Sequence, residues 1–540
     1  MSRFSAFLIV LVVWAVVYLP GLGSTELKGE EGRRILPAVT MLETGDWLVP
    51  YLGGKPYLRK PPLMNWLIAA SFKITGVRNE WTARMPSVLA VLAMGLVITG
   101  VCRKKLGAGG ALAAGLMAMS SCGLLAKARF SGAEIEGVYV PLFGIAFACW
   151  WAWWDSAPWR AWMVAFGVLG VGCLLKGPFH VAFFYVAACA VLWRAKAWKA
   201  LLHPAHFAGL VLMVGIFAAW FVPYRQTEES SKALEVWRDQ MTTRVTENRF
   251  DLSSYAANLP RGLLDQAPWI LLLWLAVRSR KDQSGEETAE DEVPPAATKR
   301  ELIAVGACFV ALLLVPGILP RYVLPLGIPW VIFLAAMLAA RRDLGPWHRG
   351  NQVLAAIVVL GALVAPVAAT FRTEDNNGAS KEHVAGWDWS MAAPAIGAAT
   401  VAFSVAAVLW SRRAVGSKLP FLAGSTAAVL GAGSLLYGSA AVPWLNRRDD
   451  LRPLAAKIDK AIGPGGKLIL YDPGYQAWIF YLRSPYRYAA TMKEIPADAE
   501  WVLAKGKDRK KRAEKRQELE VAWAFPWKEG EGFVLLQPKR

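Results

Sequence analysis

The chain has 540 residues, of which 55% are hydrophobic, and a formal net charge of +19. Apolar runs long enough to cross about 30 Å of hydrocarbon recur along it, which excludes an ordinary soluble protein. Because these runs are continuous and do not alternate, they exclude a barrel and predict a polytopic α-helical membrane protein. The basic excess would suggest nucleic acid in a soluble protein, but here it is spread over short loops, so we expect contact with membrane lipids and no nucleic acid.

The first apolar run, residues 4–21, has the length of a signal sequence. No convincing small-residue cleavage site follows it, and the chain continues into further apolar runs, so we expect the first spanning helix here. In total the hydropathy pattern predicts about thirteen transmembrane helices. They are residues 4–22, 82–101, 109–126, 137–154, 160–175, 178–193, 206–223, 263–278, 301–319, 322–340, 351–370, 391–411 and 419–441.

Basic clusters between these spans predict the orientation of the chain. With a cytoplasmic N-terminus, short loops such as Arg103-Lys104-Lys105 and Arg341-Arg342 lie inside, as the positive-inside rule requires. The odd number of spans then exports the C-terminal residues. The same topology places residues 23–81, 224–262 and 371–390 outside.

The composition changes near residue 445. We predict a transmembrane domain over residues 1–445 and a small extracytoplasmic α/β domain over residues 446–540. The second domain is expected because strand-like segments accompany helical ones. The expected strands lie within 467–472, 499–506, 520–525 and 532–538, and a helical stretch covers 508–520.

Charged and tyrosine side chains gather on the outer face of this topology, and the segment 63–76 beside them is too short to span and predicts an interfacial helix. The gathered residues are Glu30, Glu31, Tyr57, Arg59, Lys60, Glu134, Glu136, Lys176, Arg244, Arg321 and Tyr322. Each has an ordinary interpretation when it is taken alone, such as a solvated loop charge, a lipid anchor or, for the two later glutamates, an ion pair with Arg129.

Taken together, these residues suggest a site for a lipid-linked phosphate. The phosphate at the end of a buried lipid chain would lie at this membrane face. Lysine and arginine neutralise a phosphate leaving group, and a carboxylate takes the proton from an attacking hydroxyl. A transporter or flippase of a lipid-linked saccharide would share such a basic cavity, so it remains an alternative.

Residues 29–66, which read GEEGRRILPAVTMLETGDWLVPYLGGKPYLRKPPLMNW, resemble the first outer loop of the ArnT-like glycosyltransferases. That family belongs to the wider GT-C and protein O-mannosyltransferase superfamily. Its loop reads Asp-Glu-x-x-Arg, then Gly-Asp-Trp, then Tyr-x-Glu-Lys-Pro-Pro. The segments ARFSGAEIEG, LLKGP and RYVLP are similar to later landmarks of the family in the same order, and together the matches cover roughly the first 340 residues.

The resemblance implies an inverting glycosyltransferase of the bacterial inner membrane, with its active site and C-terminal domain on the periplasmic side. The donor would be a polyprenyl-phosphate sugar, commonly undecaprenyl-linked, and the acceptor lipid A or a protein. Glu30 and Glu134 would be catalytic, and Glu31 and Glu136 would be acceptor-side or secondary acidic residues. The donor phosphate would be bound by Lys60, Tyr57, Arg59, Arg244, Tyr322, Arg321 and Lys176.

Two departures from the family pattern bear on these expectations. Glu30 stands where the family has Asp, and Arg59 stands where it has Glu or Asp, a position that resembles a metal ligand in some relatives. A divalent metal therefore stays open, and no other cofactor is expected. The sugar stays open among an aminoarabinose, a hexose and galacturonic acid, and an inactive relative that binds a partner stays open too.

Overall fold

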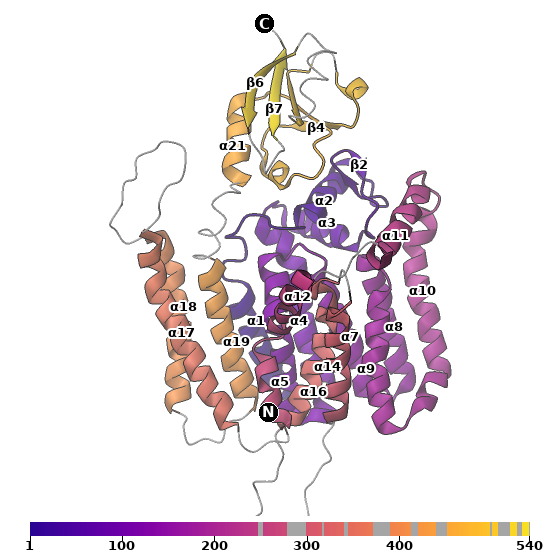
Figure 1. The fold of residues 1–540 in the computed structure, drawn as a ribbon, viewed down its shortest axis with the longest axis vertical. Coiled ribbons are helices and arrows are strands. Elements are labelled where there is room, and N and C mark those ends of the chain that lie inside the picture. The colour runs from indigo at the N-terminus through magenta and orange to yellow at the C-terminus, as the bar shows by residue number, and fades with distance from the viewer. Residues whose placement is uncertain are drawn as a thin grey trace, which may run out of the picture.

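The computed structural model describes most of the chain. The described residues are 1–246, 252–277, 299–315, 318–339, 344–370, 389–411, 419–438, 451–496, 499–505, 519–525 and 532–538. Figure 1 shows a bundle of roughly parallel helices, with a small strand-containing unit, here called the tail, at the end opposite the N-terminus. The tail consists of the described residues from 451 to 538.

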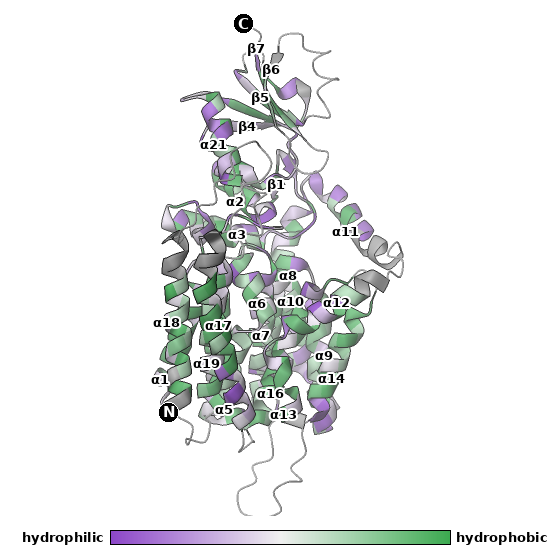
Figure 2. Cartoon of the chain, turned by 60° about the vertical axis from the view of Figure 1, so that its left-hand side comes forward, coloured by the Kyte–Doolittle hydropathy of each residue, from purple (hydrophilic) through white to green (hydrophobic). Residues whose placement is uncertain are grey.

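Apolar helices make up the bundle. They are α1 (Arg3–Tyr18), α4 (Glu80–Val101), α5 (Arg103–Met119), α6 (Cys122–Leu125), α7 (Glu136–Trp153), α8 (Pro158–Lys176), α9 (Phe179–Ala195), α10 (Pro204–Tyr224), α12 (Leu252–Asp265), α13 (Leu273–Val277), α14 (Lys299–Leu313), α15 (Pro320–Val323), α16 (Gly327–Ala339), α17 (Gly345–Thr370), α18 (Trp389–Ser411) and α19 (Leu419–Leu436). Every span predicted from hydropathy overlaps one or more of them. Their apolar colouring in Figure 2 runs along the whole bundle.

Length and apolarity single out fewer spans than the sequence pattern does. Among the described residues, six helices are long and apolar enough to cross a membrane, or seven if the bent pair α5 and α6 is one span. The expected continuous span at 263–278 is interrupted, because Pro268 lacks the N–H that an uninterrupted helix needs there. It becomes the end of α12, a 3₁₀ turn at Trp269–Leu272 and α13.

Some helices turn apolar side chains outward. On α10, Val211 is 72% exposed and Val214 60%, and on α17 Leu360 is 63% exposed. Contiguous exposed apolar surface is unfavourable in water and suits contact with lipid tails. The buried side of the bundle is a large aromatic and aliphatic core, in which Trp150 and Trp162 are fully buried.

The first loop, residues 23–81, folds into two short helices and a hairpin. They are α2 (Gly32–Thr44), β1 (Tyr51–Leu52), β2 (Lys55–Pro56) and α3 (Leu63–Thr75). The helix predicted at 63–76 is therefore present, and its 13 residues reach only about 20 Å, too short for a span. Both α2 and α3 end at a glycine with positive φ, Gly45 and Gly76, which is the usual helix stop.

The tail is a five-stranded sheet with one flanking α-helix, α21 (Leu451–Ile462). Its strand order is β4-β3-β5-β7-β6, in which β3 pairs parallel with β4 and β5 while the other pairs are antiparallel. The strands are β3 (Leu468–Tyr471), β4 (Tyr486–Ala489), β5 (Trp501–Lys505), β6 (Leu519–Phe525) and β7 (Phe533–Pro538). All four strands expected from the sequence are present, and β4 was missed. The helical stretch expected at 508–520 lies outside the described residues except for its last two, which begin β6.

The tail shares a hydrophobic core with the first loop. Ile35 and Leu36 of α2 and Ile68 of α3 belong to the same buried cluster as Trp478 and Ile479 of the tail. The first loop is therefore packed between the helix bundle and the tail.

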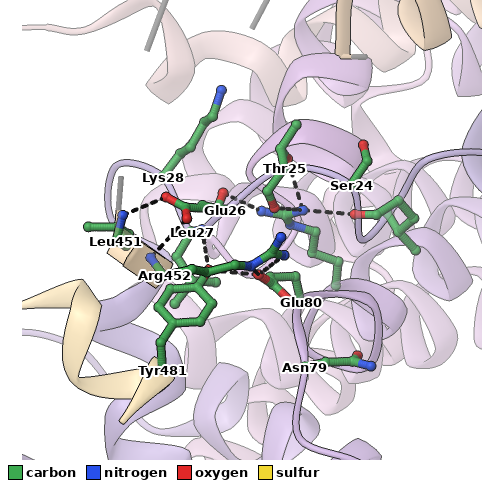
Figure 3. Close-up of polar contacts among 12 residues, drawn as sticks. Ser24, Thr25, Glu26, Leu27, Lys28, Asn79, Glu80, Leu451, Arg452 and Tyr481 are labelled. Carbon is green, nitrogen blue, oxygen red and sulfur yellow. Dashed lines mark hydrogen bonds and ion pairs between the residues drawn. The ribbon is translucent and has the colours of Figure 1, made fainter. Parts of the chain in front are cut away.

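Polar contacts reinforce this junction (Figure 3). The Glu26 carboxylate accepts hydrogen bonds from the backbone N–H groups of Leu451 (2.8 Å) and Arg452 (2.9 Å), at the start of α21, where a negative charge is favoured. The Arg452 guanidinium pairs with Glu80 at the start of α4, and the Tyr481 hydroxyl donates to the same carboxylate at 2.7 Å. The tail is thus fixed to the loop that carries the expected site.

Candidate active site

A cavity of about 430 Å³ lies where the first loop meets the ends of the bundle helices. Its walls come from α2, the segment after β2, the starts of α7 and α15, the end of α8, and α11 (Glu229–Thr246). Six basic and four acidic side chains line it. They are Arg33, Arg34, Arg59, Lys60, Lys176 and Arg321, and Glu30, Glu134, Glu136 and Asp239; Tyr57, Tyr322, Ile135 and Val236 complete the lining.

Glu30 is held at the cavity wall by its own loop. The Arg33 guanidinium donates to both Glu30 carboxylate oxygens, at 3.0 and 2.9 Å, and the Glu30 side chain is 31% exposed. The Glu30 N–H donates to Glu134 Oε1 at 3.3 Å. Gly29 before it has φ +54, and a Cβ there would lie 2.8 Å from Glu134 Oε1, so a glycine is required at this turn. The carboxylate is thus fixed in direction and still accessible.

Glu134 supports Glu30 from a buried position. Its side chain is 4% exposed, and Lys127 donates to Glu134 Oε2 at 2.8 Å. Burial raises the pKa of Glu134, and the Lys127 ammonium opposes that shift only in part. The alternative that Glu134 or Glu136 pairs with Arg129 is wrong, because the Arg129 guanidinium donates instead to the backbone carbonyls of Pro20 and Gly431.

A second ion pair also lines the cavity. Lys176 Nζ donates to Glu136 Oε1 at 2.8 Å, and Arg321 Nε lies 4.0 Å from the same oxygen. Lys176 Nζ also lies 4.3 Å from the centroid of the Tyr322 ring, within cation–π range. The Glu136 carboxylate at the start of α7 therefore contacts both the end of α8 and α15. The Tyr322 ring lies beside the Lys176 ammonium group.

Tyr57 contacts a residue that the sequence reasoning did not single out. The Arg34 guanidinium donates to the Tyr57 hydroxyl at 3.0 Å and lies 5.2 Å from the centroid of its ring. Arg34 is 6% exposed. Lys60 and Arg59 also line the cavity, and Arg59 is exposed.

Two predicted residues are not part of the described cavity wall. The backbone of Arg244 lies in α11, but its side chain is outside the described part of the chain. Glu31 is fully buried away from the cavity, where its two oxygens accept from Arg84 Nε and Nη2, each at 2.8 Å. Glu31 Oε1 also accepts from the N–H of Ala133 at 3.1 Å. Glu31 therefore ties the first loop to α4 and to the segment before α7, in place of the acceptor-side position expected for it.

Sequence reasoning also missed Arg33, Arg34, Lys127 and Asp239. The first two carry a signal, since arginines three and four residues after Glu30 in GEEGRR share a face with it once α2 begins. Lys127 stands seven residues before Glu134, across an irregular turn that no periodicity predicts. Asp239 belongs to the loop expected at 224–262, which folds as helix there.

The donor set of the cavity does not fit a resident metal ion. In the described part of the chain, no group of three or more His, Cys, Asp or Glu side chains is placed to hold one. The three cavity glutamates are each paired with a basic side chain, and Arg59, where the family pattern quoted above has Glu or Asp, adds a positive charge in place of a ligand.

Comparison with known sequences supports the family resemblance. Residues 59–222 match the family described as dolichyl-phosphate-mannose-protein mannosyltransferase. The chain is 24% identical over 372 residues to the undecaprenyl phosphate-alpha-4-amino-4-deoxy-L-arabinose arabinosyl transferase of Edwardsiella ictaluri, covering 66% of this chain and 63% of the relative. It is 27% identical over 247 residues to an uncharacterized protein of Aquifex aeolicus, covering 44% of this chain and 47% of that protein. The aligned part is less than two thirds of either relative.

Solved structures extend the likeness to nearly the whole chain. ArnT from Cupriavidus metallidurans bound to undecaprenyl phosphate matches with a TM-score of 0.70 at 19% identity, over 99% of this chain and 98% of that chain. Its apo form matches with a TM-score of 0.67 at 17% identity, over 98% and 97%. The chain has the ArnT fold, and the resemblance inferred from residues 29–66 is confirmed.

Proposed function

We propose that this chain, with its ArnT fold, is an integral-membrane glycosyltransferase that takes a sugar from a polyprenyl-phosphate donor. The observation that carries the proposal is the cavity itself, in which helices and loops far apart in sequence bring six basic and four acidic side chains to one end of an apolar bundle. A lipid chain would lie along the bundle, with its phosphate at that end.

The basic side chains would bind the donor phosphate. Lys60, Arg59 and Arg321 line the cavity, and the Tyr322 ring lies beside the Lys176 ammonium group. Charge-assisted hydrogen bonds to a phosphodiester are each worth about 1.5–3 kcal/mol, and they strengthen as charge develops on the leaving oxygen. Arg244 is assigned to the same role by family resemblance.

The reaction would be a direct displacement at the anomeric carbon. The acceptor hydroxyl oxygen forms the new glycosidic bond while the bond from the anomeric carbon to the phosphate oxygen breaks, and polyprenyl phosphate leaves with the bonding electrons. Glu30 takes the proton of the acceptor hydroxyl, and one such displacement inverts the configuration. Glu134 holds Glu30 in place by accepting a hydrogen bond from the Glu30 backbone N–H.

We also propose how the chain is arranged in the membrane. The chain would cross the inner membrane of a bacterium thirteen times, with residues 446–540 as an α/β domain on the periplasmic side above the transmembrane domain of residues 1–445. Supporting it, the basic cluster that begins at Arg103 lies near the N-terminus, where Arg103 Nη2 donates to the Met1 carbonyl at 2.6 Å. The cavity lies at the other end of the bundle, near the tail.

The acceptor would be lipid A or a protein on that side. The relative from Edwardsiella ictaluri is named as an arabinosyl transferase, and the matched family is described by protein mannosylation, so both acceptor classes enter the test.

The experiment compares wild type with Glu30→Gln in nanodiscs, given a panel of undecaprenyl-phosphate sugars and a membrane extract as acceptor. Glu43→Gln is the matched control, since Glu43 is on the same loop, pairs with Arg78 at 3.0 Å and does not line this cavity. We expect product from wild type and Glu43→Gln, and at least about 100-fold less from Glu30→Gln with donor binding retained. No product from wild type with any donor would overturn the transferase, and movement of intact donor across the bilayer would assign translocation instead.

A further inference from the structure

Arg34 is a buried cation without an acidic partner among the described residues. Its side chain lines the cavity, yet Arg34 is only 6% exposed. Within the part of the chain that the structure describes, its side chain makes one hydrogen bond, to the neutral Tyr57 hydroxyl, and its buried Nε has no partner there. A buried charge is costly unless an opposite charge and hydrogen bonds compensate it, so this guanidinium is prepared for an anion.

The three glutamates that line the cavity are already engaged. Glu30 is bound by Arg33, Glu134 by Lys127 and Glu136 by Lys176. An ammonium group that approached one of these glutamates would therefore have to displace an existing ion pair, whereas an anionic group could bind Arg34 without displacing one.

We propose that Arg34 and Tyr57 form an anion subsite that binds a phosphate or carboxylate group of the substrate and disfavours a sugar bearing an ammonium group. The inference rests on the proposed transferase function and adds a substrate class to it. The guanidinium offers a planar fork suited to two oxygens of one anion, and Tyr57, having accepted from Arg34, keeps its own O–H to donate. Arg34 also lies in the first turn of α2, where the helix dipole adds positive potential.

Two sources could supply that anion: the phosphodiester of the donor, or a carboxylate on the transferred sugar, as in a uronic acid. Three undecaprenyl-phosphate donors separate them, carrying a neutral hexose, a hexuronic acid and an amino sugar. Each is given to wild type, Arg34→Gln and Arg34→Lys. Arg78→Gln is the control, because Arg78 is on the same loop and does not line this cavity.

We expect wild type to transfer the neutral or the acidic sugar with a higher kcat/KM than the amino sugar. Arg34→Gln should lower kcat/KM about 10- to 100-fold. Arg34→Lys should lower it less, because lysine keeps the positive charge but cannot donate two parallel hydrogen bonds to one anion. An equal loss for all donors assigns the anion to the phosphodiester, and a loss confined to the acidic donor assigns it to the sugar carboxylate. Unliganded Arg34→Gln should unfold at the wild-type temperature or above, since an uncompensated buried charge has been removed.

The subsite is overturned if Arg34→Gln handles all three donors like wild type, or if wild type prefers the amino sugar. Either result leaves the transferase reaction standing. Conversely, if wild type transfers none of the sugars, the proposed function fails. The subsite can then still be tested by measuring equilibrium binding of undecaprenyl phosphate and of free hexuronate to wild type and to Arg34→Gln. Unchanged affinity for both probes in the variant would overturn it.

Discussion

The hydroxyl of Tyr475 donates a hydrogen bond to the backbone carbonyl of Gly29 at 2.8 Å, joining the tail to the turn that carries Glu30. The same ring lies 4.9 Å from the Arg33 guanidinium, which binds the Glu30 carboxylate. A Cβ at Gly32 would lie 2.8 Å from that ring. The tail therefore contacts the turn that carries Glu30, through Gly29 and Arg33.

Tyr475 is expected to act as a positioning residue. Tyr475→Phe removes one hydrogen bond, worth about 0.5–1.5 kcal/mol, so kcat should fall by up to about 10-fold. Tyr475→Ala also removes the ring beside Arg33 and should reduce kcat further. Affinity for undecaprenyl phosphate should stay within about 2-fold in both, because Tyr475 is not among the residues that line the cavity. Wild-type kcat in the alanine variant would contradict this role.

As the pH is lowered, activity should begin to fall at a higher pH than it would if an ordinary glutamate were being protonated. The pKa of an ordinary glutamate is about 4.3. Burial raises the pKa of Glu134, so protonation occurs earlier as the pH drops. The neutral form loses its ion pair with Lys127 and weakens its hold on the Glu30 N–H. Glu134→Gln should lower kcat at neutral pH and shift the acid limb of the pH–rate profile downward. An unmoved acid limb would rule out Glu134 as its origin.

Glu31 should matter for stability. Its pair with Arg84 is fully buried, and removing one partner of such a pair costs about 3–5 kcal/mol. Glu31→Gln should therefore lower the unfolding temperature clearly, as measured by thermal unfolding in detergent. Glu43→Gln breaks only an exposed pair with Arg78 and should cost about 0–1 kcal/mol. Similar unfolding temperatures for the two variants would show that the buried pair does not stabilise the loop.

Lys60 is expected to bind the donor phosphate. Lys60→Met should raise the donor KM and lower kcat together, by about 10- to 100-fold in kcat/KM, because a phosphate contact strengthens as the leaving group develops charge. Steady-state kinetics with the donor varied would measure this. An effect confined to the acceptor KM would move Lys60 to the other substrate.

The sequence predicted the bundle and most of the cavity because both depend on local signals. Continuous apolar runs indicate helices whatever the neighbouring elements are. The predicted topology then placed Glu30, Lys60 and Tyr322 at one membrane face. Long-range packing carried no such signal. Glu31 and Glu30 are adjacent and chemically alike, yet Arg84 in α4 draws one into the core while Arg33 keeps the other at the cavity.

The tail illustrates the same limit. Four of its strands follow from short β-rich segments, whereas β4 has only the four residues YRYA, without a run of aliphatic side chains, and it pairs with β3. The contact of Tyr475 with Gly29 joins residues that are 446 positions apart, and no local pattern encodes it.

The most direct test of the central claim is a single-turnover measurement with doubly labelled donor and wild-type protein in nanodiscs. Appearance of undecaprenyl phosphate and of sugar on the acceptor should follow one time course, in equal amounts, and both should be lost in Glu30→Gln. Donor that stays intact while it binds, or undecaprenyl phosphate released without sugar on any acceptor, would contradict transfer in this cavity.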